Sequence, residues 1–119
     1  MTSRLTSAVF VSALIRRVNG EGGFSAILRR GAEAAGAIFI CVPAGAAGGT
    51  TLYAQAPQSI AAERDHPAIG GRLFERIGEA LTEEQLSERF AREARFDPDF
   101  WVVELELFGR QPTEYFDVA

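Results

Sequence analysis

The sequence predicts an α+β fold, with an antiparallel sheet of four to five short strands and two helices packed on it. Three observations support this class: a helical spacing of apolar residues near the N-terminus, short β-branched runs between glycine-rich spacers, and a helix-start motif at Thr82. The 119 residues, 47% of them hydrophobic and 24% charged, have the size and composition of an ordinary globular protein. We therefore expect a single small domain over residues 1–119.

The first helix is expected at residues 5–18. Apolar side chains recur there mostly at spacings of three and four, and Thr2 or Ser3 can serve as the N-cap. The glycines that follow Asn19 are typical of a helix exit. We therefore favour a helix at this end of the chain.

A β-hairpin is the alternative for the same region. The heptapeptide at residues 11–17 is nearly repeated at residues 24–30. Asn19-Gly20, a common hairpin turn, lies between the two copies. In this interpretation residues 11–17 form a strand that pairs with residues 24–30.

Three antiparallel strands in a meander are expected next, at residues 24–30, 37–42 and 50–54. These runs are rich in Ile, Phe and Val, and the segments between them are rich in glycine and other turn-forming residues. Residues 55–70 are expected to form a long loop, because prolines interrupt them. Residues 72–77 alternate in part between apolar and polar side chains, and they are expected to add a fourth strand.

The second helix is expected to begin after Thr82. In the segment Thr82-Glu-Glu-Gln85, the Thr hydroxyl can accept a hydrogen bond from the amide of Gln85, whose side chain can reach back to Thr82. Pro98 ends this helix, because a proline disfavours helical geometry in the residue before it. We expect both helices to cover the same face of the sheet.

The last strand is expected to follow Pro98 and to return to the sheet. Side chains alternate along a strand, so one face carries Trp101, Val103, Leu105 and Leu107. We expect that apolar face to lie in the core.

Four carboxylates flank this strand and form a candidate acidic cluster: Asp97, Asp99, Glu104 and Glu106. A hard cation or an acid/base reaction can use carboxylates of this kind. The simpler interpretation, which we favour, assigns the two aspartates to the turn around Pro98 and the two glutamates to the solvated end of the strand. No EF-hand spacing or convergent histidine accompanies them, so no metal site is predicted.

Two arginine pairs, Arg16-Arg17 and Arg29-Arg30, are the candidate anion-binding residues. Guanidinium groups bind phosphate and carboxylate in a fork geometry, and two pairs near each other would make an anion site. The alternative, which we favour, is that these arginines are solvated and balance acidic side chains elsewhere in the chain.

The charge is distributed unevenly along the chain. The net charge is −4, with a balance of +3 over residues 1–60 and −7 over residues 61–119. Such asymmetry can reflect pairing within the chain or the footprint of a partner. The net negative charge argues against nucleic acid as that partner. All 12 cationic side chains are Arg, so Schiff-base and P-loop chemistry that requires Lys is excluded.

The remaining composition bounds the location and the chemistry. The single thiol, Cys41, cannot form an internal disulfide, which fits a reducing cytoplasm. No apolar run reaches the roughly 18 residues that a membrane span needs, so no membrane association is expected. The only histidine, His66, stands in a polar loop without a motif partner, and it is expected on the surface. We expect no cofactor.

Five segments together carry a resemblance to a known family: Val11–Arg17, Gly22–Phe24, Arg29–Gly31, Ala35–Phe39 and Arg95–Glu104. They resemble a group of small uncharacterised alphaproteobacterial proteins, the domain-of-unknown-function family 1491. The resemblance runs over nearly the whole chain, and its most specific part is the Arg-Phe-Asp-Pro-Asp segment that begins at Arg95. It implies a bacterial, cytoplasmic, single-domain protein, and it implies no activity, substrate, cofactor or catalytic residue.

The sequence favours a non-enzymatic interaction or regulatory module that self-associates or binds another protein. The charge asymmetry, the high apolar fraction and the lack of a complete catalytic constellation support this hypothesis. The alternative is a small anion-binding or nucleotide-binding protein, or an enzyme, that combines the arginine pairs with a carboxylate. A pocket that joins Arg29 or Arg30 to the acidic cluster would favour the alternative, whereas a flat apolar patch would favour the interaction module.

Overall fold

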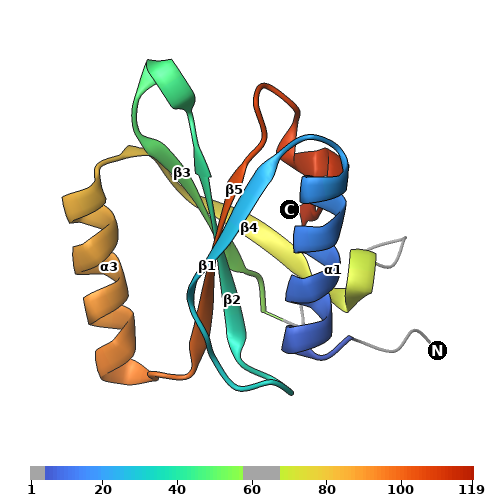
Figure 1. Ribbon diagram of the computed structural model, residues 1–119. Helices are drawn as coiled ribbons and strands as arrows, with labels where there is room; N and C mark the ends of the chain where they lie inside the picture. Colours follow the sequence, from blue (N-terminus) through green and yellow to red (C-terminus); the bar gives the residue numbers. More distant parts are fainter. Residues whose placement is uncertain (1–4, 58–67) are drawn as a thin grey trace.

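The computed structural model describes residues 5–57 and 68–119, which form a mixed sheet of six strands with a helix on each face (Figure 1). The helices and strands are α1 (Ser7–Gly20), β1 (Phe24–Arg29), β2 (Ala37–Pro43), β3 (Thr50–Gln55), β4 (Leu73–Leu81), α3 (Glu83–Phe96), β5 (Phe100–Glu106) and β6 (Asp117–Val118). Short 3-10 turns lie at Gly45–Ala47, Ile69–Gly71 and Pro112–Glu114. The strand order across the sheet is β1-β5-β2-β3-β4-β6.

The first helix is confirmed as α1, and the hairpin alternative is wrong. Thr6 caps the helix, because its Oγ1 accepts a hydrogen bond from the amide of Val9 at 3.3 Å. The predicted caps, Thr2 and Ser3, lie outside the described residues. The apolar spacing places one buried stripe along α1, made of Phe10, Val11, Leu14 and Val18. No helix in the part of the chain that the structure describes is long and apolar enough to cross a membrane.

The four strands predicted before the second helix are present. β2 and β3 form an antiparallel hairpin, and β4 pairs antiparallel with β3 on the other side. The predicted meander of residues 24–30, 37–42 and 50–54 is wrong at its first step, because β1 pairs with β5 and not with β2. β4 extends to Leu81, so it is longer than the strand predicted at residues 72–77. The predicted loop at residues 55–70 falls largely on residues 58–67, which lie outside the described part.

The prediction of a purely antiparallel sheet of four or five strands is wrong. β5 lies between β1 and β2, parallel to β2 and antiparallel to β1, and the short β6 adds a parallel partner to β4. β5 takes this interior place because both of its faces are apolar at its start. Phe100 and Val102 are buried on one face, and Trp101 and Val103 on the other.

The expectation that both helices cover one face is also wrong, since α1 and α3 lie on opposite sides of the sheet (Figure 1). The core under α1 contains Trp101, Val103 and Leu105 of β5, which confirms the predicted buried face of that strand. The core under α3 contains Phe100 and Val102, against which Leu86, Phe90 and Ala94 of the helix pack. A strand that is apolar on both faces needs a helix on each side to keep water out.

The predicted start of the second helix is confirmed at Thr82. Thr82 Oγ1 accepts from the amide of Gln85 at 3.1 Å, and Gln85 Oε1 accepts from the amide of Thr82 at 2.8 Å. The helix ends at Phe96, and Asp97 takes an extended conformation before Pro98. The capping box therefore fixes where α3 leaves β4.

The substitution Thr82→Ala should lower the free energy of unfolding by about 0.5–2 kcal/mol, because the amide of Gln85 loses its acceptor. The measurement is a chemical denaturation midpoint. Thr113→Ala is the control, since Thr113 is exposed and lies outside the long helices. Equal midpoints for wild type and Thr82→Ala would show that this cap contributes nothing.

Candidate functional site

The structure places the first arginine pair near the end of α1. The guanidinium of Arg17 donates to the main-chain carbonyl of Glu114 at 2.6 Å, lies 3.9 Å from a carboxylate oxygen of Glu21, and stands 5.2 Å from the centre of the Tyr115 ring. Arg16, the next residue, is exposed to solvent. Arg17 therefore holds the C-terminal segment against α1.

The second pair lies at the opposite end of the sheet, where β1 ends. The guanidinium of Arg29 stands 4.2 Å from the centre of the Phe100 ring and donates to the carbonyl of Pro98 at 2.7 Å. The guanidinium of Arg30 stands 5.3 Å from the centre of the Trp101 ring, on the other face. The two pairs are not brought together, because α1 and β1 run in opposite directions and each pair stands near the end of its element.

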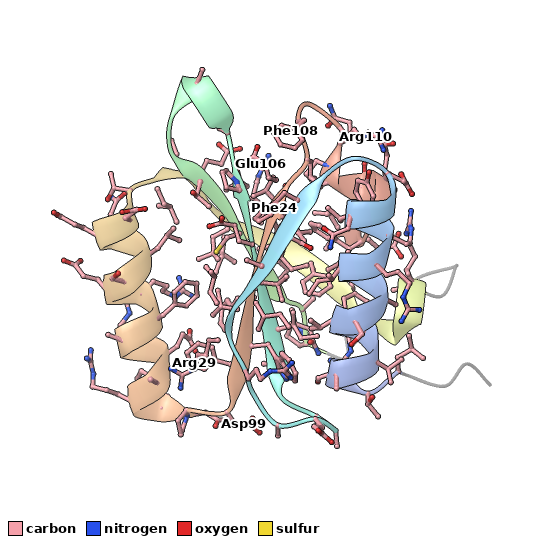
Figure 2. All side chains as sticks on the ribbon, in the orientation of Figure 1. Phe24, Arg29, Asp99, Glu106, Phe108 and Arg110 are labelled. Atoms are coloured by element: carbon pink, nitrogen blue, oxygen red, sulfur yellow. The ribbon has the colours of Figure 1, made fainter. Side chains whose placement is uncertain are left out.

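The two aspartates of the candidate acidic cluster shape the turn before β5. Asp97 Oδ1 accepts from the amide of Asp99 at 2.9 Å, and Asp99 Oδ1 accepts from the amide of Ala32 at 2.5 Å. Arg29 lies beside this turn through its bond to Pro98, and Figure 2 shows Arg29 and Asp99 at the same end of the sheet. Among the described residues Arg29 forms no ion pair with either aspartate. Both carboxylates are thus used as main-chain acceptors.

The two glutamates lie toward the other end of β5 and are partly exposed. Glu104 pairs with Cys41 of β2, and burial, with a smaller effect of the Glu104 charge, raises the pKa of the Cys41 thiol to about 12. Cys41 is therefore a neutral, unreactive thiol at physiological pH. Within residues 5–57 and 68–119, no three His, Cys, Asp or Glu side chains are placed to hold a metal ion. His66 lies outside these ranges.

The outer edge of β1 is a surface that was not among the sites predicted from the sequence. β5 is the only described strand that pairs with β1, so the other side of β1 has no described strand beside it. Phe24 and Leu28 on this strand are 64% and 57% exposed. Glu106 stands directly across from Phe24, and Figure 2 shows both at the end of the sheet that is opposite Arg29. We call β1 with its exposed side chains the β1 edge.

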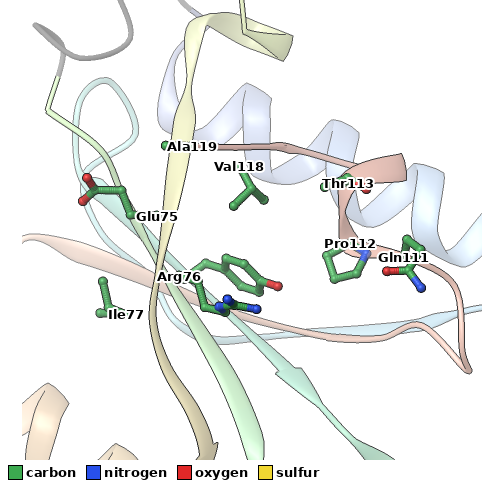
Figure 3. Close-up of a pocket in the computed structure, with 9 residues that line it drawn as sticks. Glu75, Arg76, Ile77, Gln111, Pro112, Thr113, Val118 and Ala119 are labelled. Carbon is green, nitrogen blue, oxygen red and sulfur yellow. The ribbon is translucent and has the colours of Figure 1, made fainter.

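An open cavity of about 580 Å³ lies beside β4, where its neighbour β6 ends (Figure 3). We call it the β4 cavity. It is lined by Tyr53, Glu75, Arg76, Ile77, Gln111, Pro112, Thr113, Val118 and Ala119. Tyr53 and Arg76 are direct cross-strand partners, so both side chains lie on the α1 side of the sheet. Neither residue is among the sites predicted from the sequence, although Arg76 follows the apolar Phe74 by two positions and so places a charge on the face that buries Phe74.

These features define a class: a small α+β protein whose described part has a mixed sheet between two helices, an open strand edge at β1 and a cavity beside β4. The chain belongs to the DUF1491 family of proteins of unknown function, whose family model matches residues 5–114. This match confirms the family resemblance carried by the five sequence segments. No curated protein sequence matches the chain significantly.

Two solved structures are similar over nearly their whole length. The solution structure of a protein from A. tumefaciens has 42% sequence identity and a TM-score of 0.79, with 98% of this chain and 96% of that chain covered. A crystal structure of a DUF1491 family protein from Caulobacter crescentus has 28% identity and a TM-score of 0.73, with 98% and 99% covered. The chain thus shares its fold with these alphaproteobacterial proteins.

Proposed function

We propose that this protein is a non-enzymatic interaction module that self-associates through the β1 edge. The observation that carries the proposal is the exposure of Phe24 and Leu28 on a strand whose outer side has no described partner. Such an edge presents main-chain N–H and C=O groups that another strand can pair with, and exposed apolar side chains on it favour that pairing. The single thiol, buried in the core, also fits the cytoplasmic location that we propose.

A second copy of the chain suits this edge because the edge is complementary to itself. Phe24 and Glu106 lie at one end of the β1 edge and Arg29 at the other, all on the α3 side of the sheet. When two β1 strands pair antiparallel about a two-fold axis, Arg29 of each copy comes next to Phe24 and one strand away from Glu106 of the other. Each copy thus places its Arg29 near Phe24 and Glu106 of the other copy. The two-fold axis repeats this set of contacts, so the assembly closes as a dimer.

The charges of the described residues are less favourable to the enzyme alternative. The two arginine pairs stand at opposite ends of the sheet, and the carboxylates of Asp97 and Asp99 are occupied by main-chain amides. These residues therefore do not converge on a shared site for a substrate. The interaction module requires no such convergence.

The experiment is analytical ultracentrifugation of the wild type and of Phe24→Arg over a range of concentrations. We expect a concentration-dependent dimer for the wild type and a monomer for Phe24→Arg, because the apolar contact is lost and the new guanidinium would lie next to Arg29 of the other copy. Ile69→Arg is the matched control, since Ile69 is 44% exposed and lies just before β4, which β5, β2 and β3 separate from β1. Added salt should weaken the wild-type dimer by screening Arg29 and Glu106. A wild type that remains monomeric at its highest soluble concentration would contradict the proposal.

A further inference from the structure

We infer that the β4 cavity binds a small organic anion, whose carboxylate or phosphate group is held by Arg76 and Tyr53. The cavity volume of about 580 Å³ lies within the range that is usual for small-molecule sites. The site is separate from the β1 edge, because β1 and β4 are separated by β5, β2 and β3 in the sheet. The inference therefore does not depend on self-association.

Tyr53 offers a hydroxyl donor that the rest of the described protein does not use. Its ring is only 7% exposed and packs edge-to-face on Phe116, with 5.1 Å between the ring centres. A buried tyrosine usually hydrogen-bonds through its hydroxyl. No residue in 5–57 or 68–119 forms such a bond with Tyr53, which lines the β4 cavity. Burial raises the pKa of Tyr53 above its ordinary value of 10.0, so the hydroxyl stays protonated near neutral pH and can donate a hydrogen bond to an anion.

Arg76 supplies the positive charge at the same place. Arg76 stands directly across from Tyr53 in the pairing of β3 with β4, and both residues line the cavity. Its positive charge acts to lower the pKa of Tyr53, against the larger effect of burial. One terminal nitrogen of Arg76 contacts Glu79 at 2.8 Å, and a guanidinium has five N–H donors, so others remain for a ligand. Figure 3 shows Arg76 reaching from β4 toward Pro112 and Gln111, whereas Glu75 points to the other side of the strand.

The main chain of β4 adds a third donor. The carbonyl of Phe74 faces β6, because it accepts from the amide of Ala119 at 2.7 Å. Main-chain groups of a strand alternate in direction, so the amide of Arg76, two residues on, faces the same side. The pairing of β6 with β4 ends at Val118, which stands across from Phe74. The amide of Arg76 therefore faces the cavity, beside its own guanidinium.

These three donors favour an anion over a neutral or cationic ligand. A carboxylate or phosphate group can accept from a guanidinium, a hydroxyl and an amide at once, and charge-assisted hydrogen bonds are the strongest of these. Gln111 and Thr113 are exposed at the rim, where they can hydrogen-bond to the polar remainder of an organic ligand. The donors on the described lining thus favour a small anionic head group.

The test is a titration of the full chain followed by ¹⁵N NMR, with inorganic phosphate and with succinate as probes and sodium chloride at equal ionic strength as reference. We expect phosphate or succinate, but not chloride, to shift the amides of Arg76, Gln111 and Thr113. Arg76→Gln should weaken the binding about tenfold or more, and Tyr53→Phe about threefold to tenfold. Arg76 is exposed, and Tyr53→Phe keeps the buried ring, so both variants should give the dispersed spectrum of a folded protein.

The matched control is the double variant with Arg29→Gln and Arg30→Gln, which removes two charges at the far end of β1. It should leave the affinity for either probe unchanged, because neither residue lines the cavity. Shifts that cluster around Arg29 and Arg30 instead would overturn the inference and would locate the anion at the sequence-predicted pair. Shifts that chloride reproduces, or affinities that Arg76→Gln and Tyr53→Phe leave intact, would also overturn it.

Discussion

Replacing Trp101 with alanine should lower the free energy of unfolding by about 3–5 kcal/mol. The side chain is 1% exposed in the core under α1, and its Nε1 donates to the carbonyl of Ala32 at 3.0 Å. Gly31 and Gly36 approach the indole so closely that a Cβ at either position would meet it at 2.8 and 3.1 Å. The loss is large because a cavity opens and the connection from β1 to β2 loses its support. It is comparable with the whole stability of a small domain, about 5–15 kcal/mol.

Chemical denaturation with far-UV circular dichroism measures this effect. Trp101→Phe is the matched control, since it keeps an aromatic ring and removes the hydrogen bond to Ala32. We expect its midpoint between those of the wild type and Trp101→Ala. A cooperatively folding Trp101→Ala protein with nearly wild-type stability would show that the indole is not part of the core.

Replacing Arg72 with methionine should destabilise the protein by at least about 3 kcal/mol. Arg72 is 2% exposed, and its guanidinium donates to Gln55 Oε1 and the Leu5 carbonyl at 2.8 Å and to Ser7 Oγ at 3.1 Å. Methionine has a similar volume but no donor, so these acceptors would lose their partner in a place that water reaches poorly. Arg72 thereby joins the start of α1 to the β3–β4 pair.

The control for this experiment is Arg76→Met, four residues further along the chain, in β4. Its side chain is 58% exposed, and its contact with Glu79 lies at the surface, so the midpoint should change little, by about 1 kcal/mol or less. Equal losses for the two variants would indicate a general effect of removing positive charge from this part of the chain rather than the loss of a buried network.

The sequence predicted the elements better than their arrangement. Capping chemistry is local, so Thr82 and Gln85 identified the start of α3 correctly. The alternation at Trp101 and Val103 likewise identified the buried face of β5. Strand order depends on contacts between residues that are far apart in the sequence. The residues of β1 and β2 do not indicate that a strand from much later in the chain lies between them. The sign available in the sequence was that Phe100 and Val102 are apolar as well as Trp101 and Val103, since a strand that is apolar on both faces belongs inside a sheet with two covered faces.

The candidate sites show the same limit. The two arginine pairs were candidates for one anion site because each pair is adjacent in the sequence. In the fold, Arg17 and Arg29 instead donate to main-chain carbonyls at opposite ends of the sheet. Tyr53 and Arg76 come from different strands, and only the register of β3 against β4 makes them partners. Isolated residues that meet through pairing leave no motif.

The interior position of β5 also affects the order in which the protein can fold. β1 and β2 are complete by Pro43, but each pairs with β5, whose first residue is Phe100. The chain must therefore close long loops before the centre of the sheet exists, which slows folding relative to a meander of the same length. On the ribosome, β1 emerges long before its only described partner, and the main-chain groups that pair with β5 stay without that partner during this time. β1 and β2 therefore join into one stable sheet only after the last third of the chain, which contains β5, is available.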